Sequence, residues 1–210
     1  MKMKLTTLFK RTLELEPKYV HLNNDASYYC ENLFGTLYIY FEWSNGKKDW
    51  LSNLNFPAKP YRNMKDGMWF AHRGFLKVWK NIEPCLAEKI NNPKLKGIVI
   101  SGYSHGAAIA LLCHEYCKFH RSDIKVEGYG FGCPRVVWGW FGKKTKKRFD
   151  GFTVIKVGKD LVTRVPPKIF GYRHIGNLLN IGQSSGYKSI EAHFADNYIT
   201  ELEVIENGRN

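Results

Sequence analysis

The order of apolar and polar positions along the chain predicts strands that alternate with helices. Gly97–Ser101 reads GIVIS, a short apolar run that indicates a strand covered on both faces. A helix is expected directly after it, over Ala107–Phe119. Further strands are expected at Thr36–Trp43, Gly67–Ala71, Lys125–Gly132 and Phe152–Gly158, and further helices at Phe75–Lys89 and around Leu5, Leu8, Phe9 and Leu13. This alternation predicts an α/β fold with a mostly parallel central sheet flanked by helices.

Length and composition bound the class of protein. The 210 residues are 44% hydrophobic and 24% charged, which is typical of a globular protein, and we expect one domain over residues 1–210. Lys10, Arg11 and Glu14 interrupt the opening segment, so neither a secretion signal nor a transmembrane helix is predicted. The five cysteines form no framework spacing and favour reduced thiols. We therefore expect a protein that is cytoplasmic or exported by a non-classical route.

The charge balance favours an anionic partner. The formal net charge is +13, and the most basic stretch, Trp138–Phe149, reads WGWFGKKTKKRF. Cations beside aromatic rings suit an anionic lipid surface or nucleic acid, and a solvated loop is the plain alternative. Our hypothesis is that this stretch docks on an anionic membrane surface rather than on nucleic acid, through Lys143, Lys144, Lys146, Lys147 and Arg148.

Cys113–His120 reads CHEYCKFH, which raises the question of a metal site. Cys113 and Cys117 lie four residues apart and would share one face of the predicted helix. That helix follows a buried strand, and a free cysteine in a buried helix behaves as a small hydrophobic residue. We expect no metal here and no organic cofactor.

Gly102–Gly106 reads GYSHG and lies at the junction between the buried strand and its helix. A G-x-S-x-G sequence in that context predicts a nucleophile elbow, in which glycines permit a strained serine backbone to pass close to its neighbours. The sequence pattern of a phosphate-binding loop is absent. A plain tight turn remains an alternative interpretation of GYSHG.

A serine nucleophile needs a histidine base and an acid that orients the base. In this type of fold the acid precedes the histidine in the chain. Asp160 follows the strand predicted at Phe152–Gly158 and therefore lies at the carboxyl end of the sheet. His174 and His193 are the histidines that follow Asp160, and the residues alone do not choose between them.

Four segments together resemble the class 3 lipases, the fungal-lipase-like branch of the α/β-hydrolases. The resemblance covers roughly residues 33–198. The segments are AHRGFLKVW (Ala71–Trp79), ISGYSHGAA (Ile100–Ala108), GFGCPRVVW (Gly130–Trp138) and VGKDLVTRVPPKIFGYRHIG (Val157–Gly176). In the family, the histidine of the last segment is structural and the base comes later, in a segment like EAHFADNY. The resemblance thus implies Ser104 as nucleophile, Asp160 as acid and His193 as base.

The resemblance also implies an oxyanion hole and a lid. The backbone N–H of the residue after the nucleophile, His105, should be one donor. Ser44 aligns with the family's hydroxyl donor, but Glu42 and Trp43 replace the usual arginine and glycine and put its geometry in doubt. The segment that corresponds to the family's lid contains Trp50, Leu51 and Leu54 at helical spacing. The alternative interpretation is a plain surface loop.

These features predict a serine carboxylic-ester hydrolase of the lipase or esterase type that works through an acyl-enzyme. Family resemblance implies acylglycerols or phospholipids as substrates. The alternative is a catalytically weak protein of the same fold that binds an anionic surface or polymer, which Glu42 and Trp43 would favour.

Overall fold

The computed structural model describes residues 3–15, 18–22, 26–41, 57–62, 68–140, 142–182 and 186–208. Its centre is a sheet of seven strands, and the five neighbouring strands from β3 to β11 pair in parallel. The strands in spatial order are β1 (Val20–Leu22), β2 (Ala26–Leu33), β3 (Thr36–Phe41), β6 (Gly97–Tyr103), β7 (Lys125–Phe131), β9 (Phe152–Val157) and β11 (Asn177–Ile181). The predicted α/β fold with a mostly parallel sheet is confirmed.

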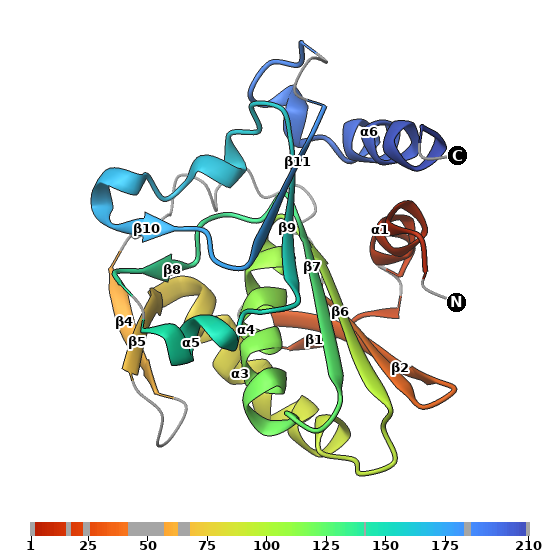
Figure 1. The fold of residues 1–210 in the computed structure, drawn as a ribbon, viewed down its shortest axis with the longest axis vertical. Helices are drawn as coiled ribbons and strands as arrows, with labels where there is room; N and C mark the ends of the chain where they lie inside the picture. The colour runs from red at the N-terminus through yellow and green to blue at the C-terminus, as the bar shows by residue number, and fades with distance from the viewer. Residues whose placement is uncertain are drawn as a thin grey trace.

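A second, antiparallel sheet lies beside the first (Figure 1). Its strands in spatial order are β10 (Tyr172–Arg173), β8 (Val137–Trp138), β5 (Met68–His72) and β4 (Ala58–Arg62). The short β8 and β10 come from the segments that follow β7 and β9, so this sheet ties the ends of the parallel strands to the start of α3.

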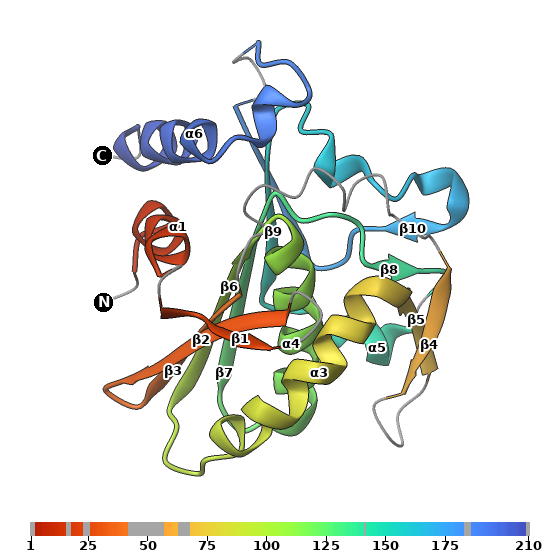
Figure 2. The same cartoon turned by 180° about the vertical axis from the view of Figure 1, so that it is seen from behind.

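Helices cover both faces of the central sheet (Figures 1 and 2). On one face lie α3 (Arg73–Ile90) and α4 (His105–His120), and on the other lie α1 (Leu5–Glu14) and α6 (Ala195–Asn207), with the short α5 (Lys143–Lys147) near α4. No helix in the described ranges is both long and apolar enough to cross a bilayer.

Strand β6 shows why its sequence is apolar without a break. Successive side chains point to opposite faces of a sheet. Ile98 and Ile100 accordingly enter the core beneath α3 and α4, while Val99 and Tyr103 pack with the core beneath α1 and α6. A parallel strand with two buried faces has no position for a polar alternation. The prediction drawn from GIVIS is therefore confirmed for the face beneath α3 and α4, whereas Val99 on the other face is only half-buried.

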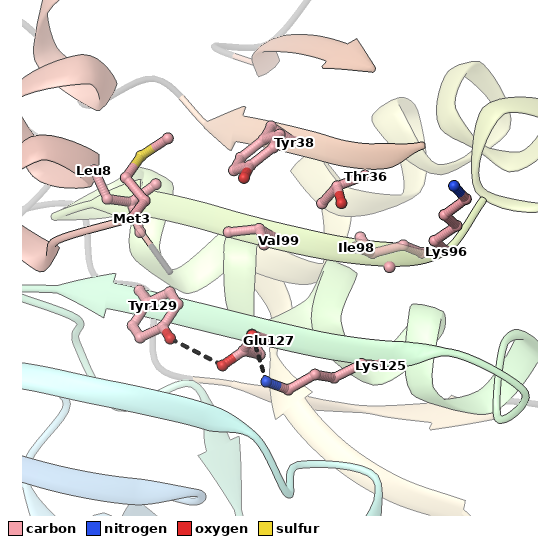
Figure 3. A pocket seen from close by; sticks show the side chains of 11 residues that line it. Met3, Leu8, Thr36, Tyr38, Lys96, Ile98, Val99, Lys125, Glu127 and Tyr129 are labelled. Atoms are coloured by element: carbon pink, nitrogen blue, oxygen red, sulfur yellow. Dashed lines mark hydrogen bonds and ion pairs between the residues drawn. The ribbon is translucent and has the colours of Figure 1, made fainter. Parts of the chain in front are cut away.

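Helix α1 covers only the carboxyl-terminal half of its face of the sheet. Its Thr12 Oγ1 lies 2.7 Å from Ser101 Oγ, near the end of β6. Toward the other end of the strands, a trough of about 280 Å³ lies open, with Val99 at its floor between Tyr38 and Tyr129 (Figure 3). This trough lies at the strand ends opposite to Ser104 and is separate from the site described below.

Candidate active site

The junction between β6 and α4 holds Ser104 in a strained backbone conformation. Its φ of 56° and ψ of −119° are unusual for a residue with a side chain. A Cβ at Gly102 would lie 2.3 Å from the carbonyl oxygen of Gly106, so the first turn of α4 can pass only over a glycine. The Ser104 N–H donates to the Phe131 carbonyl at 2.9 Å, which ties the turn to β7. The junction has the geometry of a nucleophile elbow rather than of a plain turn.

Three side chains from distant segments meet at this junction. His193 lies in the 3-10 turn Glu191–His193, and its Nε2 is 2.9 Å from Ser104 Oγ. Its Nδ1 is 2.9 Å from Oδ2 of Asp160, which lies in the loop after β9 and is fully buried. The structure thus brings Ser104, His193 and Asp160 together in one hydrogen-bonded chain. Such a chain can move a proton from the serine to the histidine.

Two donors hold the Asp160 carboxylate in place. The Val162 N–H donates to Oδ1 at 2.8 Å, and the Tyr198 hydroxyl donates to Oδ2 at 2.6 Å. Tyr198 lies on α6 and is fully buried. Burial, together with the negative charge of Asp160, raises the pKa of Tyr198 well above its usual range, so its proton stays in place. Sequence reasoning missed Tyr198, although it ends the segment EAHFADNY that carries His193.

His174 lies away from Ser104 and supports the loop that carries the acid. Its Nε2 is 2.8 Å from the carbonyl oxygen of Thr163, whose hydroxyl donates to the carbonyl of Asp160 at 2.8 Å. Burial lowers the pKa of His174 to about 4, so the ring is neutral near pH 7. Of the two histidines that the residues left open, His193 is the one beside Ser104.

Tyr103, the residue before Ser104, is a second contact that sequence reasoning missed. Its ring stacks on the His193 ring with 5.1 Å between centroids and 23° between planes. Its hydroxyl donates to the backbone carbonyl of His193. The quoted motif GYSHG contains this tyrosine, but nothing in its local sequence predicts a contact with a residue 90 positions away.

Of the two predicted oxyanion donors, only His105 lies within the described residues. Its backbone N–H belongs to the first turn of α4. The His105 side chain lies 5.5 Å from the Phe75 ring, measured between centroids. Ser44, the other predicted donor, lies outside the described residues, and so do Trp50, Leu51 and Leu54 of the predicted lid.

Four of the five residues of the predicted basic surface are exposed, and one is buried. Lys143, Lys144, Lys146 and Lys147 are exposed on α5. Arg148 is only 7% exposed, because its Nη1 donates to Glu115 Oε1 at 2.9 Å and its guanidinium carbon lies 4.7 Å from the Phe119 ring centroid. The expectation that Arg148 contributes to a docking surface is therefore wrong, since its charge is used inside the protein.

The cysteines of CHEYCKFH lie inside the core. Cys113 and Cys117 are both buried on α4, with their sulfur atoms 4.0 Å apart. Within the described part of the chain, no three histidine, cysteine or acidic side chains are arranged to hold a metal ion. These thiols therefore pack as apolar groups.

Curated relatives of this chain are named as lipases. A secreted mono- and diacylglycerol lipase of Fusarium solani is 32% identical over 132 residues, which is 60% of this chain and 38% of that protein. A lipase of Rhizomucor miehei is 26% identical over 149 residues, which is 67% of this chain and 40% of that protein. The chain thus spans about two fifths of the length of these relatives.

The names of these relatives contradict the predicted location. The proteins of Fusarium solani and Malassezia restricta are both named as secreted lipases. They point to an extracellular protein, so the expectation of a cytoplasmic or non-classically exported one is wrong. That expectation rested on the composition of the first residues and on the spacing of the five cysteines.

Solved structures and a family profile complete the comparison. The triacylglyceride lipase of Rhizomucor miehei superposes with a TM-score of 0.66 at 23% identity, over 80% of this chain and 67% of that one. A fungal lipase in complex with an inhibitor superposes with a TM-score of 0.68 at 21% identity, over 83% of this chain and 78% of that one. The profile of the family described as Lipase (class 3) matches residues 38–170. The chain is a member of the class 3 lipase family.

Proposed function

We infer that this chain is a serine carboxylic-ester hydrolase that acts on lipid esters. The observation that carries the proposal is the chain of two 2.9 Å contacts from Asp160 through His193 to Ser104. Membership of the class 3 lipases supports lipid esters as the substrate class. The names of the relatives, mono- and diacylglycerol lipases among them, favour acylglycerols.

The reaction follows from the roles of the three side chains. His193 takes the proton of Ser104, and the oxygen of Ser104 attacks the ester carbonyl. The N–H of His105, in the first turn of α4, is the proposed donor to the oxygen that becomes negative. His193 then gives its proton to the departing alcohol, and a water molecule, activated by His193, releases the acid.

The test is hydrolysis of p-nitrophenyl esters from acetate to palmitate by the wild type and by Ser104→Ala. We expect turnover in the wild type and a loss of at least about a thousandfold in the variant, because the nucleophile is absent. The chain-length profile distinguishes an esterase from a lipase. Absence of turnover in both proteins would favour the alternative, a binding protein with the same fold.

The exposed face around α5 is the proposed contact with an anionic lipid surface. Its four exposed lysines are joined by Trp140, which is 88% exposed, and the Arg173 guanidinium carbon lies 4.3 Å from the Trp140 ring centroid. Large exposed apolar side chains with neighbouring cations suit the boundary between lipid headgroups and water. Trp138, Ile169 and Phe170 add further exposed apolar surface on the adjoining segments.

Sedimentation with vesicles tests this surface. In the Ser104→Ala background, binding should rise with the fraction of anionic lipid and fall with salt. It should be lost when Lys143, Lys144, Lys146 and Lys147 are replaced together by alanine. The matched control replaces four exposed lysines elsewhere, Lys89, Lys94, Lys96 and Lys125. Equal losses of vesicle binding in the two variants would mean that binding depends only on net charge and that α5 does not contact the membrane specifically.

A further inference from the structure

We propose that Tyr103 is a positioning residue that stabilises the protonated ring of His193 during ester hydrolysis. The proposal rests on the function inferred above and adds a group outside the Ser104, His193 and Asp160 set. It assigns one role to the aromatic ring of Tyr103 and a second role to its hydroxyl, and the two can be separated by substitution.

The aromatic ring of Tyr103 lies against one face of the His193 imidazole. The two centroids are 5.1 Å apart and the planes are inclined by 23°. Tyr103 is almost fully buried and cannot turn away freely, because its ring also meets Phe9 at 5.3 Å and Tyr198 at 5.8 Å in edge-on contacts. The stacked arrangement is thus built into the core.

The chain passes close to the edge of the His193 ring at Gly132. A Cβ at Gly132 would lie 2.8 Å from Cε1 of His193 and 3.3 Å from the Tyr103 ring. The end of β7 can therefore approach both rings only because position 132 has no side chain. With its nitrogens held by Ser104 and Asp160, the imidazole is constrained on its face, its edge and both polar atoms.

The stacking has a consequence for charge. When His193 accepts the proton of Ser104, the imidazole, whose side chain is 18% exposed, becomes a cation. The face of an aromatic ring is negative and attracts a cation within about 6 Å of its centroid. Tyr103 meets this distance, so its ring favours the state in which His193 carries the proton.

Other charged or titratable groups also face this ring or its partner. Asp160 approaches from the segment after β9 and Tyr198 from α6, whereas Glu191, which precedes His193 in its own turn, contacts Lys188 instead. The negative charges of Asp160 and Asp196 act on the Tyr103 hydroxyl and, with burial as the largest cause, raise the pKa of Tyr103 far above its usual range. Tyr103 therefore stays neutral and keeps its proton for the hydrogen bond.

That hydrogen bond gives the hydroxyl a separate role. The Tyr103 hydroxyl donates to the backbone carbonyl of His193, the residue on which its own ring stacks. The bond links the end of β6 to the turn that presents His193, so Ser104 and His193 are anchored to each other through adjacent backbone. The hydroxyl thus fixes the position of His193, and the ring acts on its charge.

Two substitutions separate the roles, and a third controls for damage to the core. Tyr103→Phe keeps the ring and removes the hydroxyl, whereas Tyr103→Leu removes both. Tyr129→Leu removes another buried tyrosine of the same core, on β7 and outside the Ser104 site. The profile of kcat/KM against pH and the values of kcat and KM are measured for all three with a p-nitrophenyl ester.

For Tyr103→Leu we expect the acidic limb of the pH profile to move down by about half to one pH unit, with kcat about three- to tenfold lower. The sign follows because an imidazolium without its aromatic neighbour forms only at lower pH. Tyr103→Phe should keep the limb of the wild type and lose only kcat, and Tyr129→Leu should leave the limb unchanged. KM should stay close to the wild-type value in all three.

The proposal is overturned if Tyr103→Leu keeps the wild-type limb, or if Tyr129→Leu moves it by as much. A substrate-independent readout separates this failure from failure of the proposed function. The titration of the His193 ring nitrogens is followed by NMR in the Ser104→Ala background. The midpoint should be lower with Leu at position 103 than with Tyr or Phe, and an unchanged midpoint would refute the proposal even if no ester is hydrolysed.

Discussion

Asp160 has no exposed surface. Its hydrogen-bond partners explain how this side chain can be buried. A buried charge is tolerated only when hydrogen bonds replace the water that it loses. Val162, Tyr198 and His193 supply these bonds at distances of 2.6–2.9 Å. The orientation of Asp160 is therefore set by hydrogen bonds from its own loop after β9, from the turn Glu191–His193 and from α6.

Tyr198→Phe tests this network at the scale of one atom. Removal of the hydroxyl leaves Oδ2 of Asp160 with one donor fewer, and hydrogen bonds to charged groups contribute about 1.5–3 kcal/mol. We expect the free energy of unfolding to fall by about that amount in urea titrations, with a lower kcat. Tyr38→Phe, on a half-buried tyrosine of β3, is the control and should change stability by less than about 0.5 kcal/mol. Equal effects of the two substitutions would contradict the role of Tyr198.

At the scale of elements, the contact between α4 and the end of α5 depends on a buried ion pair. Arg148 follows α5 and reaches Glu115 on α4, which is fully buried. The basic run that precedes Arg148 gives no local sign that one of its members turns inward. The ion pair therefore fixes α5 against α4, near the end of that helix that lies away from Ser104.

Arg148→Ala and Lys147→Ala compare neighbouring residues of opposite burial. The first leaves Glu115 as a buried charge without its cation, which typically costs about 3–5 kcal/mol. The second removes an exposed charge and should change stability by less than about 0.5 kcal/mol. Chemical denaturation of both variants measures the difference in unfolding free energy. Similar midpoints would show that the ion pair between Arg148 and Glu115 does not contribute to stability.

The boundaries of the elements that were predicted agree with the structure to within a few residues, whereas β2, β11 and α6 were among the elements that were not predicted. The helix expected over Phe75–Lys89 spans Arg73–Ile90, and the one expected over Ala107–Phe119 spans His105–His120. Helix periodicity and glycine placement are local properties, so short windows of sequence report them. The two-residue strands β8 and β10 were not predicted, because two residues carry no periodicity and their pairing depends on β5.

At the scale of the whole molecule, the buried His72 and His114 and the partly buried His174 couple stability to pH. Burial lowers the pKa of His72 and His174 to about 4 and that of His114 to about 3, with the charge of His105 as a smaller cause at His72. Unfolded histidines titrate near 6.5. Between these values the unfolded chain binds more protons than the folded one, so stability rises with pH in this window.

We therefore expect the free energy of unfolding to fall as the pH decreases from about 6.5 toward 4. Each histidine contributes up to about 1.4 kcal/mol per pH unit. Urea titrations at pH 7.5, 6 and 5 measure the slope. His114→Gln should make it shallower, whereas His21→Gln, at an exposed position, should not. A stability that is equal at pH 7.5 and pH 5 would contradict the neutral state of these histidines.

The sequence by itself determined the class of fold and the strand, turn and helix that hold Ser104. Those features depend on steric and periodic properties of neighbouring residues, such as the missing Cβ at Gly102. The residues alone left His174 and His193 open, and only the family resemblance implied His193. The tertiary structure brought His193, Tyr103 and Tyr198 to this site and decided which charge is buried. His193 is 89 residues from Ser104, and Arg148 is 33 residues from Glu115. Contacts over such separations arise only when the sheet and its helices pack, because no local pattern records which distant surface a side chain will face.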